Sequence, residues 1–237
     1  MARQAKKPKT TRQRRKILRP KTRNQETYMQ SINKSDVTFC SGPAGSGKTS
    51  VSVGMACEYL IEKKVDKIII TRPVVESGRG LGHLPGTLVE KINPYLIPIL
   101  EEMNQYLTKN TVETYRSRDI IELCPLEYMR GRNFHNCFMI LDEAQNATFE
   151  QIKMFITRIG KDSKAVINGD LRQSDLGKHQ GGLKTCMDKL SEVSGVGVCK
   201  LDYSDIVRSG IVSKILMTLN KEEDEDSKIK KEIEEVG

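Results

Sequence analysis

The stretch of this sequence that most constrains the fold is GPAGSGKT at residues 42–49, which fits the pattern G-x-x-x-x-G-K-[S/T]. An apolar run at residues 37–40 predicts a buried strand before it, and the apolar residues of 50–62 recur at helical spacing after it. Glycines let the backbone turn its N–H groups inward around an anion, and the following helix adds the positive end of its dipole. The motif therefore predicts a phosphate-binding loop of the Walker A type, in preference to a glycine-rich turn that carries a lysine by chance.

A second apolar run, CFMIL at residues 137–141, ends in two acids, as in a Walker B motif. Ligands of α/β proteins bind at the carboxyl ends of the strands, so Asp142 and Glu143 are expected near the loop. Lys48 is expected to reach the β- and γ-phosphates, and Thr49 to offer its hydroxyl to Mg²⁺. Asp142 would hold the ion through water, and Glu143 would orient and polarise the attacking water. An apolar strand that ends in Asp-Glu is usually structural, so this interpretation depends on the pairing with the loop.

Strand and helix patterns alternate along the chain. Apolar runs predict strands at residues 37–40, 67–71, 137–141, 164–168 and 196–201, with helices between them. This alternation predicts one three-layer α/β domain in which a mainly parallel sheet is covered on both faces. Pro94 and Pro98 should kink or split the helix expected at residues 88–107, and residues 108–132 are ambiguous.

Charge is concentrated at the two ends of the chain. Residues 1–23 hold eleven Lys or Arg and no acid, whereas residues 221–237 hold eight acids and four lysines, which leaves residues 24–220 near neutrality. Both ends have little to bury, so we expect disordered charged segments on either side of one domain. Counter-ion release gives a basic arm salt-dependent, sequence-indifferent affinity for RNA or DNA. The alternative is a solvated tail, or a tail that binds other acidic partners.

The six cysteines, at positions 40, 57, 124, 137, 186 and 199, show no C-x-x-C pairing, and several lie within apolar runs. They are expected to be small buried hydrophobes, which fits a reducing, cytoplasmic compartment. The basic N-terminus has no apolar h-region, and no run of about 18 apolar residues occurs, so secretion and membrane spanning are both disfavoured.

Several polar residues have two interpretations. Gln25, on a short helix expected at residues 24–33, has an amide that can donate to and accept from an adenine edge, although a surface glutamine is nearly as consistent with the spacing. Gln173 follows a predicted strand and can sense a γ-phosphate, with an ordinary strand-to-helix turn as the alternative. Arg130 and Arg132 flank a glycine, either near a phosphate or nucleic-acid backbone or in a salt-bridged surface turn.

The segments that carry a family resemblance are NQ at 24–25, GPAGSGKT at 42–49, TRP at 71–73, LGHLPG at 81–86, MRGR at 129–132, LDEAQN at 141–146, GDLRQ at 169–173 and DIVR at 205–208. Together they resemble the PhoH-like family of P-loop ATPases, relatives of the first RecA-like domain of superfamily 1 helicases. The similarity extends from about residue 24 to residue 219. Its Arg-Gly-Arg and Asp-Glu-Ala-Gln-Asn segments are much more specific to the family than the loop alone.

The resemblance implies ATP binding and Mg²⁺-dependent hydrolysis, with Gln25 near adenine and with Gln145 and Gln173 as γ-phosphate sensors. The implied nucleotide-binding residues are Gln25, Gly42, Pro43, Ala44, Gly45, Ser46, Gly47, Lys48, Thr49, Ser50 and Gln145, and the implied metal ligands are Thr49 and Asp142. It also implies a RecA-like strand order, in which strand 164–168 lies between the loop strand and the Asp142 strand. Some family members carry a nuclease domain, for which the acidic end leaves no room.

A superfamily 1 helicase stabilises the developing phosphate charge with an arginine from its second RecA-like domain, and one such domain is expected here. Efficient hydrolysis would then require an arginine from a neighbouring chain. Arg208 is the first candidate, followed by Arg172, Arg130 and Arg132. A head-to-tail contact of this kind closes into a ring if the rotation permits, so we expect an oligomer such as the hexamer of related ring ATPases.

The leading hypothesis is a Mg²⁺-dependent ATPase coupled to RNA or single-stranded nucleic acid, with helicase-like remodelling. The absence of Trp, an aromatic content of 5% and the near-neutral domain weaken the coupling part. The second hypothesis is a nucleotide-gated binding module with slow or no coupled hydrolysis, which does not need the base Glu143. A small-molecule kinase is disfavoured, because the acid pair and Gln173 position water rather than an acceptor hydroxyl.

Overall fold

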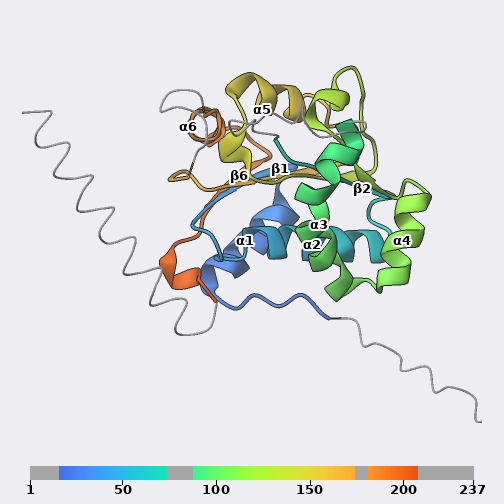
Figure 1. Cartoon of the computed structure of the whole chain (residues 1–237). Coiled ribbons are helices and arrows are strands. Elements are labelled where there is room, and N and C mark those ends of the chain that lie inside the picture. The colour runs from blue at the N-terminus through green and yellow to red at the C-terminus, as the bar shows by residue number, and fades with distance from the viewer. Residues whose placement is uncertain (1–15, 74–87, 174–180, 208–237) are drawn as a thin grey trace, which may run out of the picture.

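The computed structural model describes residues 16–73, 88–173 and 181–207. Within them, six strands form one parallel sheet in the order β3-β2-β4-β5-β1-β6 (Figure 1). The strands are β1 Val37–Ser41, β2 Lys67–Thr71, β3 Ile121–Leu123, β4 Cys137–Leu141, β5 Lys164–Gly169 and β6 Val196–Lys200. Each predicted strand is present, and β5 lies between the loop strand β1 and the acid strand β4, as expected for a RecA-like domain.

Side chains on each strand alternate between two hydrophobic cores, because successive residues of a strand point to opposite faces of the sheet. On β4, Phe138 and Ile140 enter one core, while Met139 and Leu141 enter the other. All of β4 is buried. Continuous apolar runs of this kind are typical of parallel strands that are covered on both faces.

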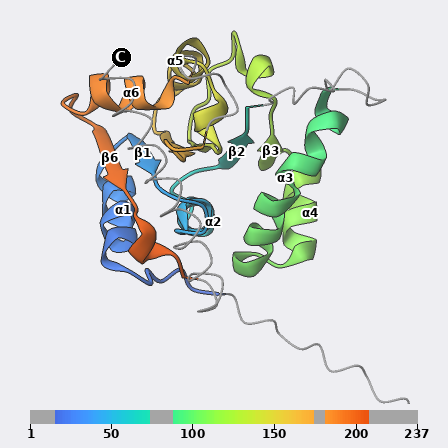
Figure 2. The same ribbon diagram turned by 60° about the vertical axis from the view of Figure 1, so that its left-hand side comes forward.

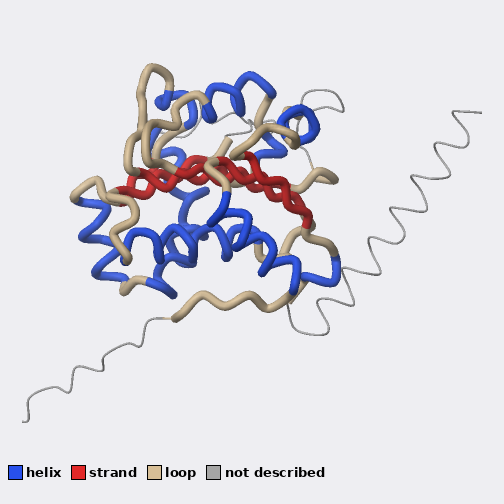
Figure 3. The backbone as a smooth tube through the Cα atoms, turned by 180° about the vertical axis from the view of Figure 1, so that it is seen from behind, coloured by secondary structure: helices blue, strands red, loops and turns tan. Residues whose placement is uncertain are grey.

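Helices cover both faces of the sheet and complete three layers (Figure 3). Helices α1 to α4 contribute to the first core, and α5 and α6 to the second; Figure 2 shows this division from another side. The helices are α1 Arg23–Lys34, α2 Lys48–Ile61, α3 Leu88–Tyr106, α4 Lys109–Ser117, α5 Phe149–Ile156 and α6 Leu183–Leu190, with 3₁₀ helices η2 Leu126–Met129, η3 Ala144–Asn146 and η4 Tyr203–Asp205. The three-layer α/β prediction is confirmed.

Helix α3 is not split by its prolines and runs unbroken through Pro94 and Pro98. Both prolines are exposed, so water can satisfy the carbonyls that lose their helical partners. Leu96, Ile99 and Met103 are fully buried in the first core. The packing of this apolar face stabilises the helix across the two prolines.

Strand β3 lies in the region that was ambiguous from sequence. Its three residues pair with β2 at the edge of the sheet, with Ile121 opposite Ile68. Ile121 is buried, whereas Glu122 and Leu123 are half-buried. A three-residue edge strand of this composition has neither a continuous apolar run nor a repeated alternation, so it gives no periodic signal.

The basic arm enters the fold earlier than predicted. Residues 16–22, here called the strap, lie against α2 and α3 before α1 begins, and the Lys16 N–H donates to the Gln105 carbonyl at 3.2 Å. Leu18 is 8% exposed and packs on Gly54, where an added Cβ would lie 2.8 Å from Leu18 Cδ1. The prediction of disorder throughout residues 1–23 is therefore wrong for residues 16–23, because Leu18 provides apolar surface to bury.

Residues 1–15 of the arm, Arg208 and the acidic end at 221–237 lie outside the described residues. All six cysteines are free and buried, as predicted. None of the helices in the described part of the chain combines the length and the apolar character that crossing a bilayer requires.

Candidate active site

The loop at residues 42–49 connects the carboxyl end of β1 to the start of α2. Gly45 and Gly47 adopt φ angles of 82° and 96°, in the left-handed region that favours glycine. Gly47 also faces Gln25, since an added Cβ would lie 2.7 Å from the Gln25 amide nitrogen. The backbone therefore has the turn and the close approach that a phosphate cradle at a helix N-terminus requires.

Lys48 is the first residue of α2, and its side chain lies over the loop. Its Nζ donates to the carbonyl of Gly42 at 2.5 Å and to that of Pro43 at 3.0 Å. Charge-assisted hydrogen bonds to phosphate are stronger than bonds to neutral carbonyls. Lys48 is thus placed to exchange the loop carbonyls for a phosphate bound in the loop.

The two predicted metal ligands, Thr49 and Asp142, lie together. Thr49 Oγ1 donates to Asp142 Oδ1 at 3.0 Å. Mg²⁺ is commonly held by one or two protein oxygens together with substrate phosphates rather than by a cage of protein ligands. Among the described residues, no cluster of three or more His, Cys, Asp or Glu side chains could hold a metal. The oxygen donors present therefore fit Mg²⁺ bound together with a nucleotide.

Asp142 is a buried carboxylate, with its side chain 2% exposed. Burial raises its pKa above the ordinary value, and the nearby guanidinium of Arg72 only partly offsets this effect. Glu143 raises the pKa further, while the hydrogen bond from Thr49 lowers it. Burial therefore makes ionisation of Asp142 more costly than in water, and a bound cation would offset that cost.

Glu143 follows Asp142 in a left-handed conformation, with φ 55° and ψ 39°, and this turns the chain into η3. Such a conformation costs roughly 1–3 kcal/mol for a residue other than glycine. Gln145 Nε2 donates to Glu143 Oε2 at 2.6 Å, and Gln145 Oε1 accepts from the Asp170 N–H at 3.0 Å. Gln145 thus connects the predicted base to the carboxyl end of β5.

Arg72 is a residue of this site that the sequence analysis included only in the TRP segment at 71–73 and to which it assigned no role. Its Nη2 donates to Asp142 Oδ2 and to Glu143 Oε1, each at 3.0 Å. Its Nη1 donates to the Tyr95 carbonyl of α3 at 2.8 Å. Arg72 and the acids are about seventy residues apart, and the pairing of β2 with β4 brings them together. The sequence feature that could have indicated Arg72 as a site residue is its position directly after a predicted buried strand.

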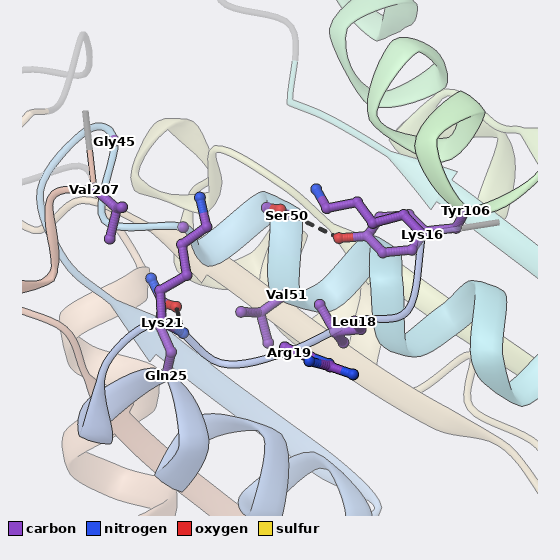
Figure 4. A pocket seen from close by; sticks show the side chains of 11 residues that line it. Lys16, Leu18, Arg19, Lys21, Gln25, Gly45, Ser50, Val51, Tyr106 and Val207 are labelled. Atoms are coloured by element: carbon purple, nitrogen blue, oxygen red, sulfur yellow. Dashed lines mark hydrogen bonds between the residues drawn. The ribbon is translucent and has the colours of Figure 1, made fainter. Parts of the chain in front are cut away.

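A pocket of about 150 Å³ lies between the loop and the strap (Figure 4). In Figure 4, Lys21, Gln25 and Gly45 lie at one end of it, and Lys16 and Tyr106 lie at the other. It is lined by Lys16, Leu18, Arg19, Lys21, Gln25, Gly45, Gly47, Ser50, Val51, Tyr106 and Val207. The pocket combines apolar walls with basic strap residues beside the phosphate cradle.

Gln25 holds the loop and the strap together. Its Nε2 donates to the Ser46 carbonyl at 2.8 Å, and its Oε1 accepts from the Lys21 N–H at 2.9 Å. A primary amide has two hydrogens and two lone pairs, so one of each is left for a base in the pocket. The predicted contact with adenine is compatible with this arrangement and stays a prediction.

Three further predicted residues are Ser50, which lines the pocket, Gln173 and Arg208. Ser50 Oγ donates to Glu102 Oε1 of α3 at 2.6 Å. Gln173 is exposed, and its side chain forms no hydrogen bond with another described residue. Arg208 is outside the described chain, but Val207 before it lines the pocket.

Of the two arginines around Gly131, Arg132 follows the structural alternative. Its Nη1 and Nη2 donate to Glu122 at 2.6 and 3.1 Å, and its guanidinium lies 4.5 Å from the Phe134 ring centroid. Burial raises the Glu122 pKa, but the hydrogen bonds from Arg132 and Lys67 prevail and hold it below the ordinary value. Arg130 is exposed.

Comparison with known proteins identifies the family of the chain. A family model described as PhoH-like protein matches residues 17–220, beginning within the strap. PhoH-like proteins of Synechocystis sp. and Bacillus subtilis are 42% and 43% identical over 208 residues, 87% of this chain. The match covers 63% and 65% of those two proteins, so this chain spans less than two thirds of their length.

The fold is also similar to that of the large terminase from a thermophilic bacteriophage. The TM-score is 0.51 at 13% sequence identity, and the match covers 82% of this chain and 49% of the terminase chain. At this identity the likeness concerns the fold alone. On the family match and the two close relatives, the chain belongs to the PhoH-like protein family.

Proposed function

We propose that this chain binds ATP with Mg²⁺ at residues 42–49 and hydrolyses it, and that hydrolysis is coupled to binding and helicase-like remodelling of RNA or single-stranded nucleic acid. The observation that carries the proposal is the 3.0 Å hydrogen bond between Thr49 and Asp142, which joins the loop to the acid pair. A phosphate cradle and strand-end carboxylates support hydrolysis when they share one site.

In the proposed reaction, Lys48 leaves the loop carbonyls and binds the β- and γ-phosphates. Thr49 and Asp142 would hold Mg²⁺, which neutralises charge on the phosphate oxygens. Glu143, held by Gln145, orients a water molecule and accepts its proton as the water oxygen bonds to the γ-phosphorus. The bond from that phosphorus to the ADP oxygen breaks in the same displacement.

The variant Glu143→Gln tests the hydrolytic step, because glutamine keeps the shape of the side chain but cannot accept the proton. Turnover is expected to fall by about 10²-fold or more, while ATP affinity stays near that of the wild type. Glu150→Gln is a matched control, since Glu150 is an exposed acid that pairs with Lys153 at 3.8 Å. Unchanged turnover in Glu143→Gln would remove Glu143 from the mechanism.

The Arg72 ion pairs favour the second candidate, a nucleotide-gated binding module with slow hydrolysis. Both acids are held by one guanidinium in the protein alone. ATP turnover with and without RNA and single-stranded DNA separates the two functions. Turnover that nucleic acid stimulates supports the coupled ATPase. The binding module is supported if turnover stays slow and the affinity for nucleic acid changes when nucleotide binds.

Efficient hydrolysis in a single RecA-like domain would need an arginine from a neighbouring chain. We propose Arg208 for this role. The chains would then form a ring, for which a hexamer is the expected size. Light scattering with an ATP analogue and Mg²⁺ should detect the oligomer. Turnover per wild-type chain should rise with protein concentration as the oligomer forms, and Arg208→Ala should abolish this rise. A monomer with brisk turnover would contradict the ring.

A further inference from the structure

Strands β2 and β4 are parallel neighbours, with Thr71 opposite Leu141. The next residues, Arg72 and Asp142, therefore leave the sheet side by side. The Asp142 N–H donates to the Thr71 carbonyl at 3.0 Å, so this pairing continues up to the acid. The position of Arg72 beside the acid pair is thus determined by the sheet.

One nitrogen of Arg72 serves both acids. Nη2 lies 3.0 Å from Asp142 Oδ2 and 3.0 Å from Glu143 Oε1, and the Arg72 side chain is 18% exposed. Two neighbouring carboxylates repel each other most strongly where water is excluded. The guanidinium offsets this repulsion in the protein without a bound cation.

Building on the nucleotide site proposed above, we propose that Arg72 is a resident counter-ion that competes with the divalent cation for Asp142 and holds Glu143 until the cation binds. The two carboxylates carry a charge of −2, which Arg72 reduces to −1. Only Asp142 is deeply buried, with its side chain 2% exposed, whereas the Glu143 side chain is 41% exposed. A divalent cation that binds Asp142 must therefore displace the Arg72 hydrogen bond or share a buried carboxylate with another positive charge. Arg72 therefore withdraws from the acids when the metal–nucleotide complex binds.

The same withdrawal frees Glu143. In the ion-paired state, Glu143 Oε1 accepts from Arg72 and Oε2 accepts from Gln145. Loss of the Arg72 contact leaves Gln145 as the side chain that orients the base. Arg72 is in this sense a positioning residue, and it controls when Glu143 is available to water.

The guanidinium of Arg72 also contacts helix α3. Arg72 Nη1 donates to the Tyr95 carbonyl, and Arg72 Nε is buried with no hydrogen-bond partner among the described residues. Movement of Arg72 away from the acids thus changes a contact with α3.

Calorimetric titration of Mg²⁺·ADP, and of ADP in EDTA, into the wild type and Arg72→Ala tests this competition. Removal of the counter-ion should tighten Mg²⁺·ADP binding by about tenfold and leave metal-free ADP binding unchanged. Arg132→Ala is the matched control, because Arg132 makes a comparable ion pair with Glu122 away from the loop, and neither affinity should change.

Weaker Mg²⁺·ADP binding in Arg72→Ala would assign Arg72 to direct contact with phosphate and overturn the proposal, as would unchanged binding. If the wild type itself binds no nucleotide in Mg²⁺ buffer, the proposed function fails and this inference fails with it. Should Arg72→Ala not fold, Arg72→Gln removes the charge but keeps a polar side chain, and it should bind Mg²⁺·ADP more tightly than the wild type. Equal or weaker binding by Arg72→Gln would contradict the competition.

Discussion

At the scale of single residues, two carboxylates show opposite effects of their surroundings. Burial raises the pKa of Asp142 in spite of a neighbouring arginine. At Glu122 burial acts in the same direction, but hydrogen bonds from Arg132 and Lys67 outweigh it and lower the pKa. Glu122 therefore contributes to stability as an ion, whereas ionised Asp142 reduces stability until a cation arrives.

Asp142→Asn should consequently stabilise the metal-free protein at neutral pH. A raised folded-state pKa means that the folded state binds more protons, so stability is lost as pH rises from the ordinary value of 3.8 through the raised value. Asparagine does not ionise and avoids this loss. In EDTA, calorimetry should show a higher Tm for Asp142→Asn, by roughly 2–4 °C for each kcal/mol gained in the free energy of unfolding. Adding Mg²⁺·ADP should raise the Tm of this variant less than it raises the Tm of the wild type.

Glu122→Gln is the paired variant of opposite sign. The depressed pKa of Glu122 in the folded protein stabilises the fold at pH values above the ordinary pKa of 4.5. This stabilisation is lost as pH falls through the folded-state pKa, so the substitution should lower Tm at pH 7. A lower Tm for Asp142→Asn in EDTA would show that the Arg72 pair outweighs the burial of Asp142.

Gln25→Ala should reduce the preference of the protein for ATP over GTP. The free hydrogen and lone pair of the amide match the edge of adenine, and the loop contact to Ser46 does not depend on the base. Equilibrium titration with both nucleotides measures the ratio of their affinities. An equal loss for ATP and GTP would assign Gln25 to support of the loop alone.

At the scale of elements, Leu18 is the buried apolar side chain of the strap and packs on α2. Leu18→Ala should lower the free energy of unfolding by about 2 kcal/mol, because the buried side chain loses its packing on α2. Ile17→Ala, next in the chain and 67% exposed, should change it by less than about 0.5 kcal/mol. Urea titrations at constant m-value compare the two variants, and equal effects would mean that Leu18 does not anchor the strap.

The elements predicted correctly from sequence are those with strong local patterns. Buried strands such as β4 are continuous apolar runs, and the glycines of the loop are dictated by its backbone. Features that depend on long-range pairing could not be placed from local patterns alone. Arg72 meets the acids through strand register, β3 is too short to show a period, and α3 crosses two prolines because its buried face packs well.

The same distinction applies to the site. Lys48, Thr49, Asp142 and Glu143 come from two recognisable motifs, and the structure places Thr49 against Asp142. The hydrogen bonds that orient Glu143 come from Gln145 and Arg72, and their geometry depends on the folded edge of the sheet. Sequence motifs therefore predict candidate reactive groups, whereas the hydrogen bonds that hold Glu143 are seen only in the fold.

At the scale of the whole molecule, charge is separated from the near-neutral domain. Deleting residues 1–15 removes seven Lys or Arg but leaves the strap. Affinity for RNA or single-stranded DNA should fall, and the slope of log K against log salt should flatten by up to about 0.7 per lost phosphate contact. Deletion of residues 221–237, which removes an acidic segment, should not weaken binding. Equal affinity and slope after the first deletion would exclude the arm from nucleic-acid binding.

The central claim is that the loop and the acid pair form one magnesium–nucleotide site. Calorimetric titration of a non-hydrolysable ATP analogue into the wild-type chain, in Mg²⁺ buffer and again in EDTA, tests it most directly. The account predicts uptake of about one nucleotide per chain in Mg²⁺, markedly weakened in EDTA. No uptake in Mg²⁺ buffer, or uptake that is indifferent to the metal, would contradict it.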